Sequence, residues 1–191
     1  MKRAIALGTF DGVHIGHRAI INAAIDRAAK LDMEPMIYTF TAHPMALFGK
    51  QPPLLMTQSE RMAALGGMGC ALSADEFSAE YAATEPEQFI KMLIERFNMG
   101  CAVAGFNYTF GRRGEGSVEL IKKLGEKYGF AVEIVPPVMY KGEAVSSTRI
   151  RACLEAGRVK DAGEMLGAPY SITGPVIRNR GIGRTLDYPT A

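Results

Sequence analysis

Short apolar runs alternate with segments of helical periodicity along most of this 191-residue chain. Residues 4–7 (AIAL) have the pattern of a buried strand, and apolar side chains recur at helical spacing over residues 16–31. Further strand-like runs occupy residues 35–40, 70–75, 101–106 and 130–137. A repeated strand–helix order is typical of an open parallel sheet covered by helices on both faces, so we expect an α/β fold.

Residues that favour helix ends set the expected boundaries between these segments. Ser59 is the expected N-cap of one helix, and Ser117 is the expected N-cap of another. Pro86 suits the first turn of a third helix, which we expect to end at Gly100. Two short helices are expected further on, at residues 147–157 and 159–167.

The pattern changes at Pro169, where the chain begins to alternate and then becomes rich in glycine and arginine. We therefore expect residues 1–168 to form one domain and residues 169–191 to be the opening strand and loop of a β domain. About twenty residues cannot bury a core of their own. We expect the chain to stop just inside that second domain.

Charge and cysteine content limit the function classes. Lys and Arg total 22 against 20 Asp and Glu, a net charge of +2 with no long basic block, which argues against a nucleic-acid-binding surface. No apolar run is long enough for a signal peptide or a membrane span. Cys70, Cys101 and Cys153 lie far apart without metal-site spacing, so we expect reduced thiols and a cytoplasmic location.

The loop GTFDGVHIGH, at residues 8–17, follows the first expected strand and leads into the first expected helix. Gly8 and Gly12 permit a close approach of the backbone to a ligand, while His14 precedes the helix and His17 lies in its first turn. A helix N-terminus carries free N–H groups and a partial positive charge. The loop therefore predicts an anion site, suited to phosphoryl transfer.

Other interpretations of this loop must be considered. Asp11, His14 and His17 could bind a metal, but no further His or Cys has supporting spacing, and His43 is the only other histidine. A catalytic triad needs a nucleophilic Ser or Cys, and none is nearby. A tight turn capped by Asp11 explains the glycines but not both histidines.

Two later segments also carry groups suited to nucleotide ligands. VSSTRIR, at residues 145–151, places three hydroxyls and two arginines at the start of an expected helix, where they suit phosphate oxygens. The alternative is an ordinary helix cap with surface arginines. GFNYTFGRRGEG, at residues 105–116, offers Asn107 and three aromatic rings for a planar ligand; the alternative is a surface loop with buried aromatics.

Together these motifs resemble those of the nucleotidyltransferases that carry a His-x-Gly-His motif, and more closely the bacterial FAD synthetases. Residues 145–151 resemble the second signature of that superfamily, and residues 105–111 are similar to a Gly-x-x-Phe-x-Phe-Gly loop that serves the flavin. Residues 40–44 (FTAHP) resemble a Phe-Asp/Glu-Pro-His-Pro loop, although Thr and Ala replace the acid and the first proline. Residues 169–191 resemble the start of the riboflavin kinase domain fused to these enzymes, and its Pro-Thr-Ala-Asn motif breaks off after Ala191.

The resemblance implies a Rossmann-like open parallel sheet followed by the first part of a β-barrel domain. It implies FMN adenylyltransferase activity, in which ATP and FMN give FAD and pyrophosphate, with Mg²⁺ carried by the phosphates and no protein metal site. Kinase activity is not expected, because that domain is incomplete. The implied catalytic residues are His14, His17 and Arg151; the nucleotide-binding residues are Gly8, Phe10, Asp11, Gly12, Gly16, Ser146, Ser147 and Thr148; the FMN-binding residues are His43, Pro44, Asn107 and Phe110.

Two alternatives stay open at this point. One is a nucleotidyltransferase that acts on another phosphorylated acceptor, and the other is a flavin- or nucleotide-binding module without catalysis. We expect only small-molecule partners, with no nucleic acid and no membrane.

Overall fold

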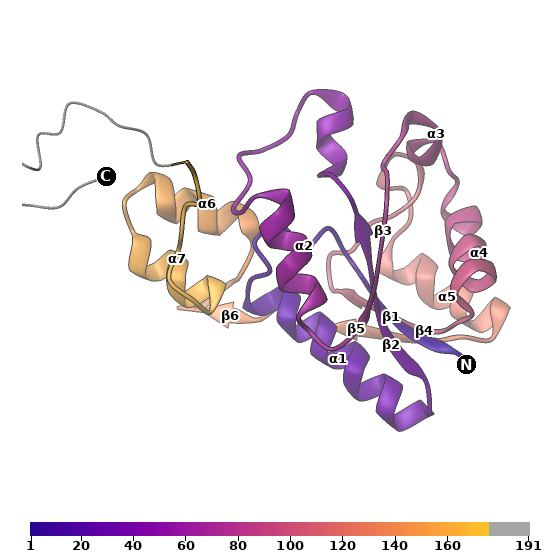
Figure 1. The fold of residues 1–191 in the computed structure, drawn as a ribbon. Helices are drawn as coiled ribbons and strands as arrows, with labels where there is room; N and C mark the ends of the chain where they lie inside the picture. The colour runs from indigo at the N-terminus through magenta and orange to yellow at the C-terminus, as the bar shows by residue number, and fades with distance from the viewer. Residues whose placement is uncertain (176–191) are drawn as a thin grey trace, which may run out of the picture.

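The computed structural model describes residues 1–175, and residues 176–191 lie outside the described part. Five parallel strands form one sheet in the order β3-β2-β1-β4-β5 (Figure 1). The expected α/β fold with an open parallel sheet is therefore confirmed. The strands are β1 (Arg3–Leu7), β2 (Glu34–Phe40), β3 (Ala71–Asp75), β4 (Met99–Gly105) and β5 (Ala131–Val135).

Helices cover both faces of this sheet, as Figure 1 shows. Buried side chains of α1 (Ile15–Leu31) and α2 (Gln58–Gly66) pack in one core cluster, and those of α4 (Pro86–Phe97) and α5 (Val118–Tyr128) pack in the other. Every residue of β4 is buried, as expected of a central strand with helices on both faces. The remaining helical elements are η1 (Pro44–Phe48), α3 (Ala79–Ala82), η2 (Arg112–Gly114), α6 (Ser147–Glu155) and α7 (Val159–Leu166).

Two expected helix boundaries are wrong. Thr57, rather than Ser59, is the N-cap of α2, because Thr57 and Glu60 bond each other's backbone N–H in a capping box. The helix α4 stops at Phe97 because Asn98 adopts a left-handed conformation (φ 51°), and Gly100 lies inside β4 instead. The predicted N-cap Ser117 and the first-turn position of Pro86 are confirmed.

The last two helices form a small unit beside the sheet. Ile150, Cys153, Ala162 and Met165 from α6 and α7 make a third core cluster, which also includes Leu55. A short antiparallel hairpin, β6 (Met139–Tyr140) and β7 (Glu143–Ala144), connects the sheet to α6. This arrangement brings the start of α6 next to the loop that follows β1.

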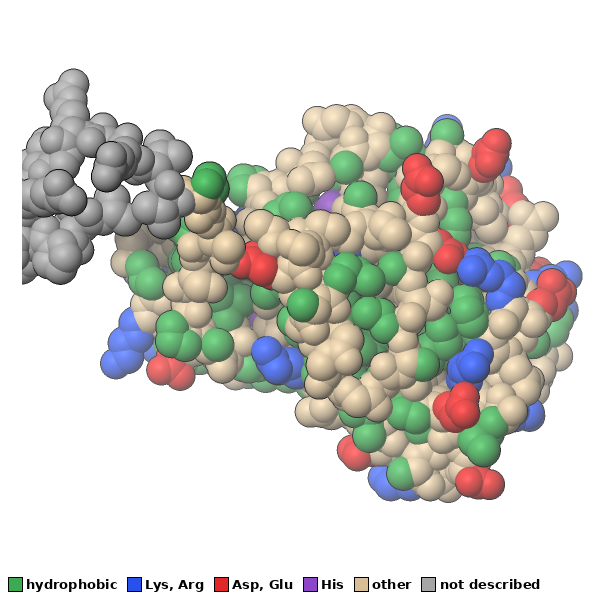
Figure 2. All heavy atoms as spheres, in the orientation of Figure 1, with side chains coloured by type: hydrophobic (Ala, Val, Ile, Leu, Met, Phe, Trp, Pro, Cys, Tyr) green, Lys and Arg blue, Asp and Glu red, His purple; other side chains and the backbone are tan. Residues whose placement is uncertain are grey.

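Residues 169–175 form no helix or strand, and most of the predicted β-barrel segment lies outside the described residues. Within residues 1–175, no helix is both long enough and apolar enough to cross a membrane. On the face shown in Figure 2, basic and acidic side chains are interspersed, in keeping with the net charge of +2.

Candidate active site

A cleft of about 380 Å³ opens at the carboxyl ends of the central strands. In parallel α/β sheets this edge is where ligands bind, because strand-to-helix loops converge there. The loop after β1, the loops after β4 and β5, and the start of α6 all contribute residues to its lining. The predicted site residues that line it are Gly8, Phe10, His14, Gly16, His17, Asn107, Ser146, Ser147 and Thr148.

The loop after β1 has an unusual backbone. Gly12 has φ +80°, and Phe10 and Val13 also have positive φ angles, of 54° and 39°. Such angles are strained for residues that carry a side chain, so surrounding contacts must hold them. A Cβ on Gly8 would lie 2.9 Å from the Phe10 ring, which explains why glycine stands there.

His14 and His17 are placed as the sequence predicts, one before the helix α1 and one in its first turn. His14 is the N-cap of α1, and its Nδ1 accepts a hydrogen bond of 3.2 Å from the His17 backbone N–H. The two imidazole rings stack with centroids 3.5 Å apart. Because Nδ1 of His14 is an acceptor, the proton of the neutral ring is on Nε2.

Burial keeps both histidines neutral. It lowers the pKa of His14 to about 4, and it lowers the pKa of His17 well below the usual value, with the nearby His14 and Arg61 adding to the effect. The Nδ1 of His17 is buried and has no hydrogen-bond partner among the described residues. Buried polar atoms in folded proteins are rarely left without a partner, so this nitrogen is an exception.

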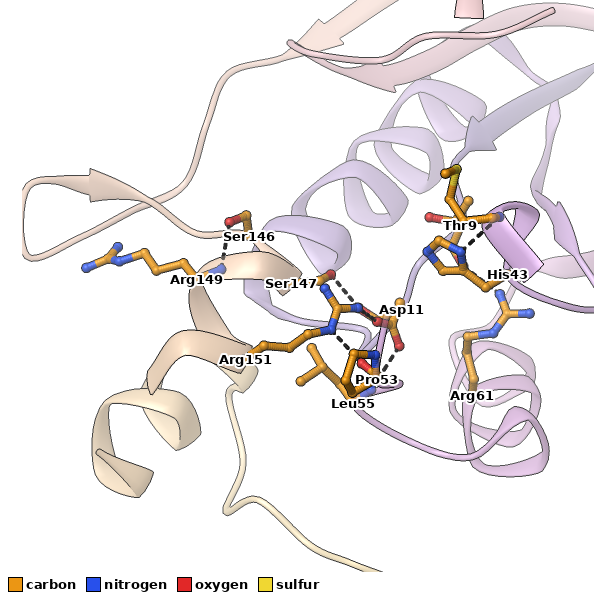
Figure 3. Close-up of polar contacts among 11 residues, drawn as sticks. Thr9, Asp11, His43, Pro53, Leu55, Arg61, Ser146, Ser147, Arg149 and Arg151 are labelled. Atoms are coloured by element: carbon orange, nitrogen blue, oxygen red, sulfur yellow. Dashed lines mark hydrogen bonds and ion pairs between the residues drawn. The ribbon is translucent and has the colours of Figure 1, made fainter. Parts of the chain in front are cut away.

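The start of α6 also lines the cleft. Ser146 caps the helix by accepting a hydrogen bond of 3.2 Å from the Arg149 backbone N–H. The Ser147 hydroxyl donates to the Asp11 backbone carbonyl at 2.9 Å, which ties α6 to the loop after β1 (Figure 3). Thr148 is exposed at the cleft.

Asp11 and Arg151 form an ion pair away from the cleft lining. Their side chains are only 5% and 13% exposed, and a guanidinium nitrogen of Arg151 bonds the Asp11 carboxylate directly. Arg151 also donates from Nε to the Pro53 carbonyl at 2.5 Å, and the other Asp11 oxygen accepts the Leu55 backbone N–H at 3.2 Å (Figure 3). The pair thus joins α6, the loop after β1 and the segment before α2, and the catalytic role of Arg151 stays a prediction.

The residues predicted to bind FMN do not come together. Asn107 lines the cleft, whereas Phe110 is 5% exposed and stacks on Tyr108 in the core beneath it. His43 accepts the Met45 backbone N–H at its Nδ1, and Pro44 begins η1; neither lines the cleft. Their flavin-binding roles stay predictions.

A model of the FAD synthetase family matches residues 1–149 of this chain. The chain belongs to the FAD synthetase family. Relatives named "Bifunctional riboflavin kinase/FMN adenylyltransferase" are 32% identical in Listeria monocytogenes and 35% identical in Bacillus subtilis, each over 100% of this chain. The one in Escherichia coli K12 is 30% identical over 98% of it.

A solved structure supports the fold of this FAD synthetase family member. The structure titled "Crystal Structure of Macrolide-efflux Protein from Streptococcus pneumoniae" superposes with a TM-score of 0.86 at 33% identity and covers 98% of the chain. The chain spans 61–62% of the length of these relatives and 62% of that solved chain. The predicted family is therefore confirmed.

Sequence reasoning missed several residues of the cleft in this family member. Val135, Pro136 and Pro137 form an apolar wall with Phe106 and Ile20. Val135 is the last residue of β5 and the two prolines follow it, so the rule that ligands bind at the carboxyl ends of strands could have found all three. Arg61 on α2 does not line the cleft, but it bonds the loop after β1 from behind. No sequence pattern could have predicted this contact, because it depends on how α2 packs.

Proposed function

We propose that this chain transfers AMP from ATP to FMN, which yields FAD and pyrophosphate. The observation that carries the proposal is that two phosphate-suited segments, residues 8–17 and the start of α6, line the same cleft. The names of the relatives from Listeria monocytogenes and Bacillus subtilis include this activity. Those names also include riboflavin kinase, and we propose that activity only for a longer protein that would contain the complete kinase domain.

In the proposed reaction, an oxygen of the FMN phosphate attacks the α-phosphorus of ATP. A new P–O bond forms as the bond between the α-phosphorus and the bridging oxygen to the β-phosphorus breaks, and pyrophosphate leaves with that electron pair. The protein supplies position and charge stabilisation, and it forms no covalent bond. This fits a cleft whose lining contains hydrogen-bond donors and a helix N-terminus.

His14 and His17 are the proposed catalytic groups. Both rings are neutral before substrate binds, so His14 offers its Nε2–H as a donor to a phosphate oxygen. The polyphosphate would favour protonation of the rings, because a nearby negative charge raises the pKa of an imidazole. The hydroxyls of Ser146 and Thr148 are proposed to hold the β- and γ-phosphates together with the free N–H groups of α6. Ser147 would contribute its backbone N–H, because its hydroxyl donates to the Asp11 carbonyl.

Magnesium enters this proposal as part of the substrate Mg·ATP. Among residues 1–175 there is no group of three His, Cys, Asp or Glu side chains that could hold a metal ion, and the cleft lining includes no carboxylate. Mg²⁺ commonly binds through substrate phosphates and retains several waters. The residues present fit that mode rather than a protein cage.

Asn107 is the proposed contact for FMN, since it lines the cleft beside the apolar wall of Phe106, Val135 and Pro136. An amide can hydrogen-bond a ring edge or a phosphate, and the apolar wall suits a planar ring.

We also propose a cytoplasmic location, supported by Cys70, Cys101 and Cys153, which are all free thiols.

The test is to supply Mg·ATP and FMN to the purified chain and to measure FAD by chromatography and pyrophosphate by a coupled assay. Equal amounts of FAD and pyrophosphate are expected. Binding of FMN without pyrophosphate release would favour a binding module, and turnover with phosphopantetheine but not FMN would favour another acceptor.

A further inference from the structure

Arg61 is a buried arginine beneath the loop that carries the two histidines. It lies on α2, and it is 6% exposed, although arginine is rarely buried without a partner. Its side chain runs from α2 toward Thr9 and His43, behind the wall of the cleft (Figure 3). Nothing in the proposed reaction so far uses this residue.

The guanidinium of Arg61 bonds three separate segments. One terminal nitrogen donates to the Thr9 carbonyl at 2.6 Å and to the Thr39 hydroxyl at 2.9 Å. The other donates to the Phe40 carbonyl and to the Gln58 side-chain oxygen. Arg61 thus connects α2, the end of β2 and the loop after β1 through one rigid planar group.

All these acceptors are uncharged. Among residues 1–175, no carboxylate forms an ion pair with Arg61. Burial lowers the pKa of Arg61, and the Asp11 carboxylate, which is itself paired with Arg151, only partly offsets this effect. A guanidinium offers five N–H donors in a planar group, which suits a cluster of oxygen acceptors, and it brings a positive charge to this position as well.

The bond to Thr9 acts on the strained part of the loop. Thr9 directly precedes Phe10, whose φ of 54° must be held by its surroundings. The Phe10 ring meets the His17 ring edge-on, with centroids 5.4 Å apart. A short chain of contacts therefore runs from Arg61 through Thr9 and Phe10 to His17.

The positive charge of Arg61 also acts electrostatically on His17. The two charged or titratable groups that act on His17 are His14, at the start of its own helix, and Arg61, from α2; both disfavour its protonated form. Arg61 lies on the side of the loop after β1 that faces away from the cleft. From there its positive charge would favour the binding of a polyphosphate in the cleft.

We propose that Arg61 is a positioning residue of the nucleotide site: its bond to Thr9 fixes the loop after β1, and with it the places of Phe10 and His17. The expected effect of Arg61 on the reaction rate rests on the proposed adenylyl transfer. Its effect on His17 is a property of the protein alone and can be measured without any reaction.

The test compares Arg61→Met, which removes the charge and the bonds, with Arg61→Lys, which keeps the charge and part of the bonding. Arg27→Met is the matched control, since Arg27 is an exposed arginine of α1 that pairs with Glu133. Each variant is checked for folding by circular dichroism and thermal melting. FAD formation is then measured against pH, and the titration of His17 is followed by NMR.

We expect kcat of Arg61→Met to fall about 100-fold with little change in KM for FMN, because a misplaced loop impairs the transition state more than binding. His17 should protonate at a higher pH in this variant. Arg61→Lys should recover part of kcat and most of the His17 titration, and Arg27→Met should match the wild type in both.

A folded Arg61→Met protein with wild-type kcat and an unchanged His17 titration would overturn the proposal. If that variant does not fold, the kcat of Arg61→Lys decides, and a wild-type kcat in this variant would overturn the proposal. If the wild type forms no FAD, the proposed function fails, and the NMR titration still decides the role of Arg61.

Discussion

At the residue scale, the nitrogens of the two histidines have different partners. Nδ1 of His14 is occupied by the His17 backbone N–H, whereas Nδ1 of His17 is buried and unpaired among the described residues. His14 is therefore fixed by the helix that it caps, while the buried Nδ1 of His17 forms no hydrogen bond among the described residues. These roles lead to different predictions for the two residues.

His17→Ala should lower kcat for FAD formation on the order of 10²–10³-fold, because it removes one preorganised group beside the reacting phosphates. The measurement is steady-state FAD production at saturating Mg·ATP and FMN. Circular dichroism should show an unchanged fold. Near-normal turnover in a folded variant would contradict the catalytic role of His17.

His14 should make the protein less stable in mild acid. Its folded pKa of about 4 is below the unfolded value of 6.5, so the unfolded chain binds the proton more readily between these values. Stability is therefore complete above pH 6.5 and falls as the pH drops toward 4. From pH 7 to pH 5, we expect His14 to account for a loss of about 2 kcal/mol in the free energy of unfolding.

Urea unfolding of the wild type and of His14→Asn at the two pH values checks this prediction. Asparagine keeps a side-chain acceptor for the helix cap and does not titrate. The variant should lose less stability than the wild type between pH 7 and pH 5. Identical losses in the two proteins would show that His14 is not the cause.

At the element scale, the structure shows how α6 is attached to the loop after β1. Ser147 binds the Asp11 backbone, and Arg151 binds the Asp11 carboxylate, so one residue of the loop receives both contacts. The two phosphate-suited segments are therefore held at a fixed separation before any ligand binds. Preorganisation of this kind reduces the free energy needed to order the site.

Breaking the buried Asp11–Arg151 pair should be strongly destabilising, because each single change leaves a buried charge unpaired. Asp11→Asn and Arg151→Met should each lower the free energy of unfolding by about 3 kcal/mol, and the double variant should lose clearly less than the sum. Urea unfolding of all four proteins measures the coupling.

The Arg3–Glu34 pair is the matched control for this cycle, since its side chains are 33% and 48% exposed. Glu34→Gln should cost less than about 1 kcal/mol. Additive losses at Asp11 and Arg151 would contradict the view that this pair joins α6 to the loop.

At the scale of the whole molecule, two core clusters share one central pair of strands. All of β4 and most of β1 are buried, whereas β3 and β5 lie at the sheet edges and are only partly buried. The cleft thus opens at the end of the best-buried strands. Binding sites are commonly built on loops that a rigid scaffold positions.

Native-state hydrogen exchange should follow this arrangement. The amides of β1 and β4 should exchange slowest, with protection close to that of global unfolding, and those of the β6–β7 hairpin should exchange fastest among the strands. Mass spectrometry of peptides or NMR can measure both. Equal protection of β4 and the hairpin would contradict the prediction.

Much of this fold was accessible from the sequence, because strand and helix periodicity are local properties. The pattern gave the five strands and the main helices, and the helix start after His14. Boundaries failed where a cap depended on a side-chain pair, as at Thr57 and Glu60, or on a left-handed residue, as at Asn98. The short hairpin and the single-turn helices carried too few residues to show a period.

The sequence by itself determined the class of the fold, the family and the two segments that face the cleft, since motif and periodicity are written in neighbouring residues. Only the tertiary structure decided that Arg151 pairs with Asp11, that Phe110 lies in the core, and that Arg61 reaches Thr9. Arg151 and Asp11 are 140 residues apart in the sequence, and Arg61 and Thr9 are 52 apart. The Phe110 ring likewise packs against side chains that are distant in the sequence. Burial and charge pairing at such separations are properties of the packed chain, and no local pattern encodes them.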